Sequence, residues 1–263
     1  PTDREGNVRA SDVAGMIRKD TKAVIALHAS NVCGTIVPVE EIGRICQERG
    51  VFFVVDTAQS AGTIPLHMEE ACVDFLAFTG HKGLLGPQGV GGFLISDRLD
   101  GQMEPLIAGG TGSSSDSLDM PRTLPDKYES GTMNLPGIIG LHAALSYLER
   151  TGLEAIRRRK LELTGYFLEE VKKLPSVRIA GRQGTEGRVA VVSLDFEGRD
   201  NAVTAFRLEQ GYGIMTRVGL HCAPMAHRAL GTFPQGTVRF AFSASNTEDE
   251  IDRCVRALHS ILD

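Results

Sequence analysis

Lys82 is the residue whose neighbours most strongly indicate chemistry. It follows the apolar stretch FLAFTG (75–80) and His81, and a glycine-rich turn, GPQGVGG (86–92), comes shortly after it. A lysine held at the end of a strand among apolar residues loses hydration, which favours the neutral amine. A neutral amine can form a Schiff base with a carbonyl. The alternative is an exposed loop lysine, since most lysines are solvated.

Asp56 supplies a second chemical group. It ends the apolar run VFFVVD (51–56), and Gln59 lies one turn further on. A bare buried carboxylate is costly, so this aspartate must face water, a cation or a cationic ligand, unless it is simply a helix cap or turn residue. An acid that can pair with a pyridinium nitrogen, next to a Schiff-base lysine, is typical of pyridoxal phosphate sites. Asp56 and Lys82 therefore predict that cofactor.

Other cofactor and metal motifs fit less well. The segment 86–92 is not a GxGxxG turn between a strand and a helix, and GHKG (80–83) lacks the remaining residues of a phosphate-binding P-loop. The five cysteines are odd in number, widely spaced and without CxxC pairs, which argues against disulfides or structural zinc. We expect no metal, because metal-ligand spacing is missing from His28, Cys33, His81 and His221.

The elements that position these groups alternate between strand and helix in the first half of the chain. Helices are predicted at 11–20, with Ser11 as N-cap, and at 38–50; strands are predicted at 23–29, 51–56, 72–80 and 89–96. Apolar strands joined by helical crossovers predict a parallel or mixed sheet covered on both faces. Ligands of such sheets bind at the carboxyl ends of the strands, which is where Asp56 and Lys82 are expected.

The second half has a different pattern. A Gly-, Ser- and Pro-rich loop (109–132) precedes two long amphipathic helices at 134–152 and 153–175. An α+β unit follows, with helices from Asp200 and from Thr247, whose Glu250 completes a capping box. The shift in composition near residue 148 predicts a large domain, 1–148, and a smaller C-terminal α+β domain, 149–263. Cys46 and Cys254 occupy apolar helix faces, so we expect both in the core.

Composition limits the partners. The chain of 263 residues carries a net charge of −5 without a basic stripe, so we expect no nucleic-acid partner. Apolar runs of about 18 residues are lacking, so we expect no membrane association. The sequence has no charged-then-apolar leader, and we expect a cytoplasmic protein.

Five ordered segments, taken together, closely resemble the class V aminotransferase superfamily, and within it the SufS-type cysteine desulfurases and selenocysteine lyases. The resemblance covers essentially the whole chain. It implies the pyridoxal-phosphate-dependent transferase fold type I, an α/β fold with an incomplete, mostly parallel large-domain sheet and a smaller C-terminal α+β domain. The segments are 28–62, 74–95, 128–145, 216–224 and 238–247.

The resemblance also implies roles in cofactor binding. Lys82 matches the Schiff-base lysine, Asp56 the partner of the pyridine nitrogen, and Gln59 the glutamine at the phenolic oxygen. The residues that match the phosphate ligands are Thr79, His81 and, donated across a homodimer interface, Thr132.

The resemblance further implies a substrate site. Asn31 matches an asparagine near the substrate carboxylate, and Arg239 matches the arginine that pairs with that carboxylate bidentately, which lysine would do poorly. Arg217 matches a second active-site arginine. Cys222 matches the nucleophile that accepts sulfur.

The residues themselves leave alternatives for two of these positions. Cys222 could be a buried thiol at a helix start, but it lies on a turn beside His221, and a cationic neighbour favours a thiolate. Arg239 could be an ordinary surface arginine. However, strand alternation turns Val238 and Phe240 to the opposite side, which leaves Arg239 on a polar face.

The implied reaction converts L-cysteine to L-alanine, with Lys82 as general base and a persulfide formed on Cys222. A sulfur-acceptor protein would follow, as in iron–sulfur cluster assembly. The alternatives are a selenocysteine lyase using the same residues, another class V reaction of the aminotransferase or kynureninase type without need of Cys222, or an inactive module that only dimerises or acts as a scaffold.

The resemblance begins partway into the family pattern. The family segment with the histidine that stacks on the cofactor ring, and with a Gly-Thr-Thr phosphate loop, has no match in this sequence. We therefore expect a piece of a longer or divided protein, which binds the cofactor poorly alone.

Overall fold

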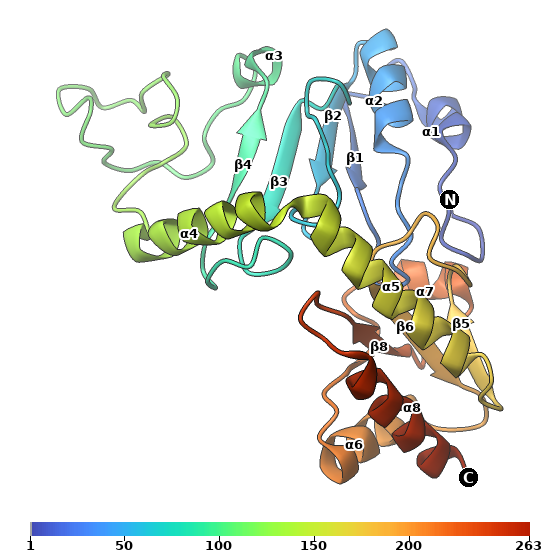
Figure 1. Ribbon diagram of the computed structural model, residues 1–263. Helices are drawn as coiled ribbons and strands as arrows, with labels where there is room; N and C mark the ends of the chain where they lie inside the picture. The colour runs from blue at the N-terminus through green and yellow to red at the C-terminus, as the bar shows by residue number, and fades with distance from the viewer. Residues whose placement is uncertain (1) are drawn as a thin grey trace.

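Residues 2–263, which the computed structural model describes, contain two four-stranded sheets. The first sheet has the order β1-β2-β3-β4 (Figure 1). Its strands are β1 (Ala23–Leu27), β2 (Phe52–Asp56), β3 (Phe75–Thr79) and β4 (Gly91–Ile95). β1, β2 and β3 are parallel, and β4 runs antiparallel to β3. The predicted mostly parallel sheet is therefore confirmed. The expected cover on both faces is wrong for β1, because its side chains Ile25 and Leu27 are exposed. Its strands are rich in Phe, Val and Ile, which favour pleated, half-buried positions.

Among the described residues, three short helices accompany this sheet: α1 (Ala10–Met16), α2 (Val39–Glu48) and α3 (Asp97–Asp100). α2 packs on β1 and β2, α1 packs on α2, and α3 follows β4. The apolar side of α2, with Ile42 and Cys46, is buried against Phe53 of β2, so the predicted core position of Cys46 is confirmed. The predicted N-cap at Ser11 is wrong. The helix begins at Ala10, which is buried, and Ser11 lies inside the first turn after Arg9.

The second sheet is antiparallel throughout, with the order β5-β6-β8-β7. The strands are β5 (Val177–Ala180), β6 (Val191–Phe196), β7 (Arg217–Gly219) and β8 (Thr237–Ala241). Four helices belong to this half: α5 (Leu153–Val171), α6 (Asn201–Tyr212), α7 (Pro224–Leu230) and α8 (Glu248–Leu262). Apolar side chains of α5, α6 and α8 share one core with the sheet. Asp200 caps α6, and the capping box of Thr247 and Glu250 is confirmed.

Two consecutive helices connect the sheets. α4 (Leu135–Thr151) crosses the end of the first sheet, and α5 continues toward the second (Figure 1). Gly152 separates them with φ 86°, a left-handed value that glycine adopts readily. The predicted domain boundary at residue 148 falls inside α4, and the division into two domains remains a prediction.

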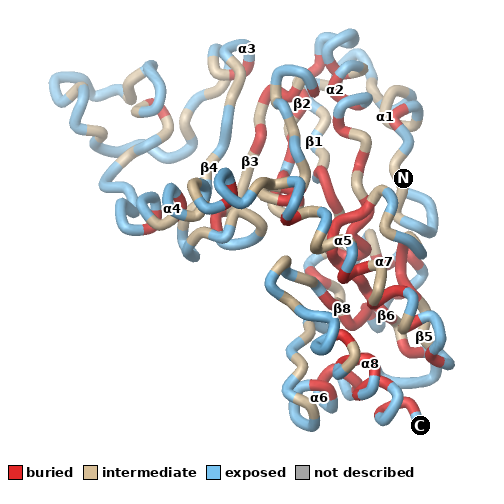
Figure 2. Tube along the Cα trace, in the orientation of Figure 1, coloured by how far each residue is buried: buried red, intermediate tan, exposed pale blue. Residues whose placement is uncertain are grey.

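The segment 101–134 between α3 and α4 is irregular and mostly exposed (Figure 2). It exposes large apolar side chains, including those of Leu106, Ile107 and Leu118. Among the described helices, we find none with the length and apolar character needed to cross a membrane.

Candidate active site

The first sheet brings Asp56 and Lys82 to one edge. Asp56 ends β2 and Thr79 ends β3, and the two parallel strands are in register with Asp56 opposite Ala77. Lys82 follows Thr79 in the next turn and is exposed, so the expected loss of hydration among apolar residues is wrong for this structure and the alternative of an exposed lysine holds. The Asp56 carboxylate is also exposed and accepts a hydrogen bond of 2.7 Å from the backbone N–H of Ala58. The sequence allows two interpretations of Asp56, a turn residue and a carboxylate that faces water. Both hold, because the carboxylate accepts a hydrogen bond within the turn and is exposed at the strand end.

Tight packing fixes the loop that carries Lys82. Gly86 N–H donates to the Gly80 carbonyl at 2.8 Å, and Leu85 N–H donates to the Lys82 carbonyl at 3.0 Å. Behind this loop, Gly62 lies so close to Gly83 that a Cβ on Gly62 would fall 2.1 Å from the Gly83 carbonyl oxygen. The glycines thus allow two backbone segments to touch at the base of Lys82.

A cavity of about 240 Å³ lies between the two sheets. The turn after β2 contributes Gln59, the next loop contributes Lys82, and β8 of the second sheet contributes Arg239. Lys160 of α5 also lines it. The structure therefore brings together Gln59, Lys82 and Arg239, three of the predicted site residues. The full lining is Ala58, Gln59, Thr63, Lys82, Gly83, Lys160, Val189, Ala190, Val191, Arg239, Ala241 and Phe242.

The predicted phosphate ligands lie in two places. Thr79 Oγ1 and His81 Nδ1 are 2.8 Å apart, so these two side chains form one polar pair beside Lys82. Thr132 lies in the exposed segment 101–134. Thr132 lies outside the lining of the cavity that contains Lys82, and among the described residues we find no hydrogen bond from it to Thr79 or His81.

Asn31 joins Arg239 to the turn that carries Cys222. The Arg239 guanidinium donates to the Asn31 carbonyl at 2.8 Å, and Asn31 Nδ2 donates to the His221 carbonyl at 2.7 Å. Cys222 follows directly and is exposed, so the alternative of a buried thiol does not hold. The predicted carboxylate-binding arginine and the predicted nucleophile thus share one hydrogen-bonded framework.

Strand alternation orients Arg239. Its neighbours Val238 and Phe240 are buried in the core of the second sheet, while Arg239 lies on the opposite face and lines the cavity. Arg217 on β7 is directly opposite Arg239 in register and is exposed. Burial lowers the pKa of Arg239, the positive charge of Arg217 lowers it further, and Cys222 acts in the opposite direction. Cys222 therefore lies within the electrostatic influence of Arg239.

The turn at Cys222 has an unusual backbone. His221 and Cys222 have φ values of 49° and 61°, in the left-handed region that non-glycine residues seldom adopt. Two contacts fix His221: the bond from Asn31, and a 3.1 Å contact of its buried Nε2 with Thr237 Oγ1. Because burial, and then Arg239, lower the pKa of His221 to about 4, this ring is neutral at pH 7. The predicted cationic histidine beside Cys222 is therefore wrong, and Arg239 is the nearby positive charge.

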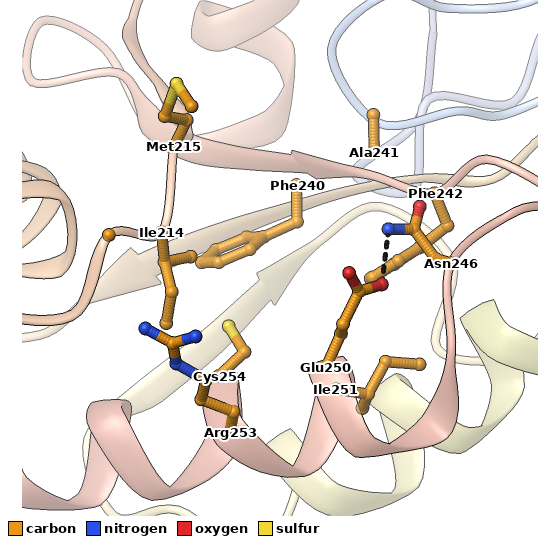
Figure 3. A pocket seen from close by; sticks show the side chains of 11 residues that line it. Ile214, Met215, Phe240, Ala241, Phe242, Asn246, Glu250, Ile251, Arg253 and Cys254 are labelled. Carbon is orange, nitrogen blue, oxygen red and sulfur yellow. Dashed lines mark hydrogen bonds between the residues drawn. The ribbon is translucent and has the colours of Figure 1, made fainter.

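A second cavity, of about 250 Å³, lies on the face of β8 that carries Phe240 (Figure 3). Ile214, Phe240 and Cys254 give it an apolar floor. Its carboxylate, Glu250, is engaged in the cap of α8 and accepts a bond from Asn246. Burial raises the pKa of Cys254 to about 12, so this thiol stays protonated and its predicted core role is confirmed.

Lys160 is the residue of the first cavity that sequence reasoning missed. It lies in the run RRRK (157–160), which resembles an exposed basic helix face. A signal was available: Ile156, Leu163 and Thr164 are three or four positions away and are buried, so helical spacing places Lys160 on the same inner face.

Comparison with known proteins identifies the class. The profile of the Aminotransferase class-V family matches residues 1–254, and the chain belongs to this family, which is pyridoxal-phosphate-dependent. Its relatives include a probable cysteine desulfurase from Methanothermobacter thermautotrophicus, 34% identical over 98% of this chain and 65% of the relative. Another, from Halalkalibacterium halodurans, is 35% identical over 98% of this chain and 62% of the relative.

Solved structures agree with the predicted fold. The apo cysteine desulfurase from Thermococcus onnurineus NA1 matches with a TM-score of 0.92 and 35% identity, over 100% of this chain and 65% of that protein. The Escherichia coli cysteine desulfurase CsdA, in an S-sulfonic acid form, matches with a TM-score of 0.88 and 27% identity, over 100% and 64%. The expected type I fold is thus confirmed, and the chain spans less than two thirds of the length of these relatives.

Proposed function

We propose that the chain is part of a pyridoxal-phosphate-dependent cysteine desulfurase that converts L-cysteine to L-alanine and leaves the sulfur on Cys222 as a persulfide. The observation that carries this proposal is the framework Arg239–Asn31–His221–Cys222. It places an exposed thiol next to an arginine that lines the same cavity as Lys82. The names of the relatives support the same chemistry.

The donor set fits the cofactor. Lys82 is an exposed amine at a strand edge that also presents the Asp56 carboxylate. In the proposed enzyme, Lys82 would hold the cofactor covalently, Asp56 would pair with its ring nitrogen and Gln59 would contact its phenolic oxygen. Thr79 and His81 hold the phosphate, with Thr132 of a second copy. The bound cofactor would supply an electron sink for cleavage at the substrate's side chain.

In the proposed reaction, different residues of the chain bind the substrate, transfer the proton and attack the sulfur. The Arg239 guanidinium binds the substrate carboxylate, assisted by Asn31 and Arg217. Lys82 accepts and returns the proton of the substrate's α-carbon. The Cys222 thiolate attacks the substrate sulfur, so that an S–S bond forms while the C–S bond breaks. Overall, L-cysteine and the Cys222 thiol become L-alanine and the Cys222 persulfide, and an acceptor protein takes up the terminal sulfur.

A homodimer fits the same site. The exposed segment 101–134 carries Thr132, and α4 exposes apolar side chains next to it, including Leu135 (58% exposed) and Ile139 (69%). Apolar area of this kind is typical of protein interfaces. We propose that a second copy of the protein covers it and brings Thr132 toward the Thr79–His81 pair.

Replacement of Cys222 by serine tests the function. In the whole protein loaded with pyridoxal phosphate, Cys222→Ser should abolish sulfur release from L-cysteine and leave the absorbance of the lysine-bound cofactor unchanged. Cys254→Ser is the matched control, because that thiol is buried and protonated. Unchanged turnover in Cys222→Ser would exclude the proposed mechanism. Separate assays with selenocysteine distinguish a selenocysteine lyase.

A further inference from the structure

Lys160 is a half-buried cation that the proposed mechanism does not use. It extends from α5 into the cavity between the sheets, and its Nζ donates a 3.1 Å hydrogen bond to Thr63 Oγ1, a residue of the first half of the chain. Burial lowers the pKa of Lys160, and no other group is a cause of that shift. Within residues 2–263, its ammonium forms no ion pair.

The cavity around Lys160 is strongly cationic. Lys82, Lys160 and Arg239 line it, and its other polar side chains are Gln59 and Thr63. Among the described residues that form the lining, we find neither Asp nor Glu. Lys82 is exposed, whereas Lys160 and Arg239 are half-buried. Positive charges that are partly withdrawn from water without a counter-ion are costly, and an anionic ligand reduces that cost. The cavity is therefore built to attract an anion.

We propose that Lys160 and Arg239 together form a two-cation site for a carboxylate of the substrate. This inference rests on the proposed function, because Lys82 is there assigned to the cofactor and leaves two cations for the ligand. Arg239 comes from β8 and Lys160 from α5, so the carboxylate would be bound by two different elements of the second half. Thr63 holds the Lys160 ammonium at the cavity wall from the other side.

The carboxylate has two possible sources. It is either the α-carboxylate, which L-cysteine shares with every amino acid, bound between Arg239 and Lys160, or the side-chain acid of an amino acid other than L-cysteine that the same cavity accepts. A cavity of about 240 Å³ has room for a small amino acid. L-Alanine, the expected product, has the first group alone, whereas L-aspartate has both. Binding of these two amino acids therefore separates the sources.

The first experiment measures binding of L-alanine and of L-aspartate to the whole, cofactor-loaded protein by isothermal titration calorimetry. Lys160→Met should raise the dissociation constant about tenfold, and Lys160→Arg should restore most of the affinity. Arg158→Met is the matched control, since it removes an exposed cation from the same helix outside the cavity. Weaker binding of both amino acids identifies the α-carboxylate; weaker binding of L-aspartate alone identifies the side-chain acid. Affinities equal to those of Arg158→Met overturn the proposal.

A second experiment needs no variant and uses the whole, cofactor-loaded protein, in which Lys82 is assigned to the cofactor. Acetic anhydride acetylates accessible lysines, and mass spectrometry gives the rate at each position. An excess of L-aspartate should slow acetylation of Lys160 at least threefold relative to exposed Lys19. Equal slowing at both lysines contradicts the carboxylate site. This readout is independent of Cys222 and of turnover, so failure of the site and failure of the desulfurase proposal can be told apart.

Discussion

Asn31 and His221 lie 190 positions apart, yet the Asn31 amide donates a 2.7 Å hydrogen bond to the His221 carbonyl. The bond links the loop after β1 of the first sheet to the turn before α7. Asn31 is also the acceptor, through its own carbonyl, for Arg239. The sequence resemblance implied a place for Asn31 near the substrate carboxylate. The structure adds a mechanical role, because this residue fixes the backbone next to the candidate nucleophile.

Asn31→Ala should therefore slow sulfur transfer. The substitution removes the bond to His221, worth about 1 kcal/mol, and frees a turn whose left-handed residues need support. We expect about a fivefold to tenfold lower rate of L-alanine formation from L-cysteine. Asn246→Ala, which removes a bond at the cap of α8, is the control and should leave the rate unchanged. A wild-type rate in Asn31→Ala would show that the turn holds Cys222 without this bond.

Gly62→Ala should impair attachment of the cofactor to Lys82. The new Cβ would meet the Gly83 carbonyl oxygen at 2.1 Å, so the loop that carries Lys82 must shift. The absorbance of lysine-bound pyridoxal phosphate measures the effect. Gly50→Ala is the matched control: its φ of 67° resembles the 72° of Gly62, but its Cβ would find no described atom within 4 Å. Equal cofactor binding by both variants would contradict the steric argument.

Stability should fall as the pH decreases from 6.5 toward 4. Burial lowers the pKa of His28 from 6.5 to about 4, so across this window the unfolded chain binds a proton that the folded protein does not. The contribution is fully present above pH 6.5 and amounts to at most about 3 kcal/mol. In His28→Gln, the free energy of unfolding measured in urea should depend less on pH. Part of the dependence should remain, because burial also lowers the pKa of His221. If stability depended on pH equally in His28→Gln and in the wild type, His28 would be ruled out as a source of this pH dependence.

Arg188→Met should destabilise the protein by about 3 kcal/mol. Arg188 is 1% exposed and donates to the backbone carbonyls of Arg182, Gly184, Cys33 and Val191. Methionine fills the space but leaves these carbonyls without their donor. Urea unfolding measures the change in the free energy of unfolding. The stability of Arg188→Lys should lie between those of the wild type and Arg188→Met. Arg158→Met, on an exposed helix face, should match the wild type.

Local patterns predicted much of this architecture. The apolar runs ending at Asp56 and Thr79 predicted parallel strands, because the strands of parallel sheets are usually rich in continuous apolar residues. The alternation around Arg239 predicted its polar side, and Thr247 with Glu250 predicted a cap. Each of these signals depends on neighbours within one element.

Other features depend on contacts between distant segments, for which the sequence carries at most an indirect sign, such as the helical spacing of Lys160. His221 was expected to be cationic, but Thr237 and the surrounding core hold it buried and neutral. Lys160 was hidden in a basic run, and its partner Thr63 lies 97 positions away. The first turn of α1 shows a smaller case: the helix begins at Ala10, which is buried, one residue ahead of Ser11.

The central cavity takes its walls from both sheets: Gln59 and Lys82 from one side, Arg239 and Phe242 from the other. A molecule that contacts both walls is in effect a removable cross-link between the N-terminal and C-terminal halves. Binding of such a molecule should therefore raise the melting temperature of the protein. The stabilisation should increase with the logarithm of the ligand concentration once that concentration exceeds the dissociation constant.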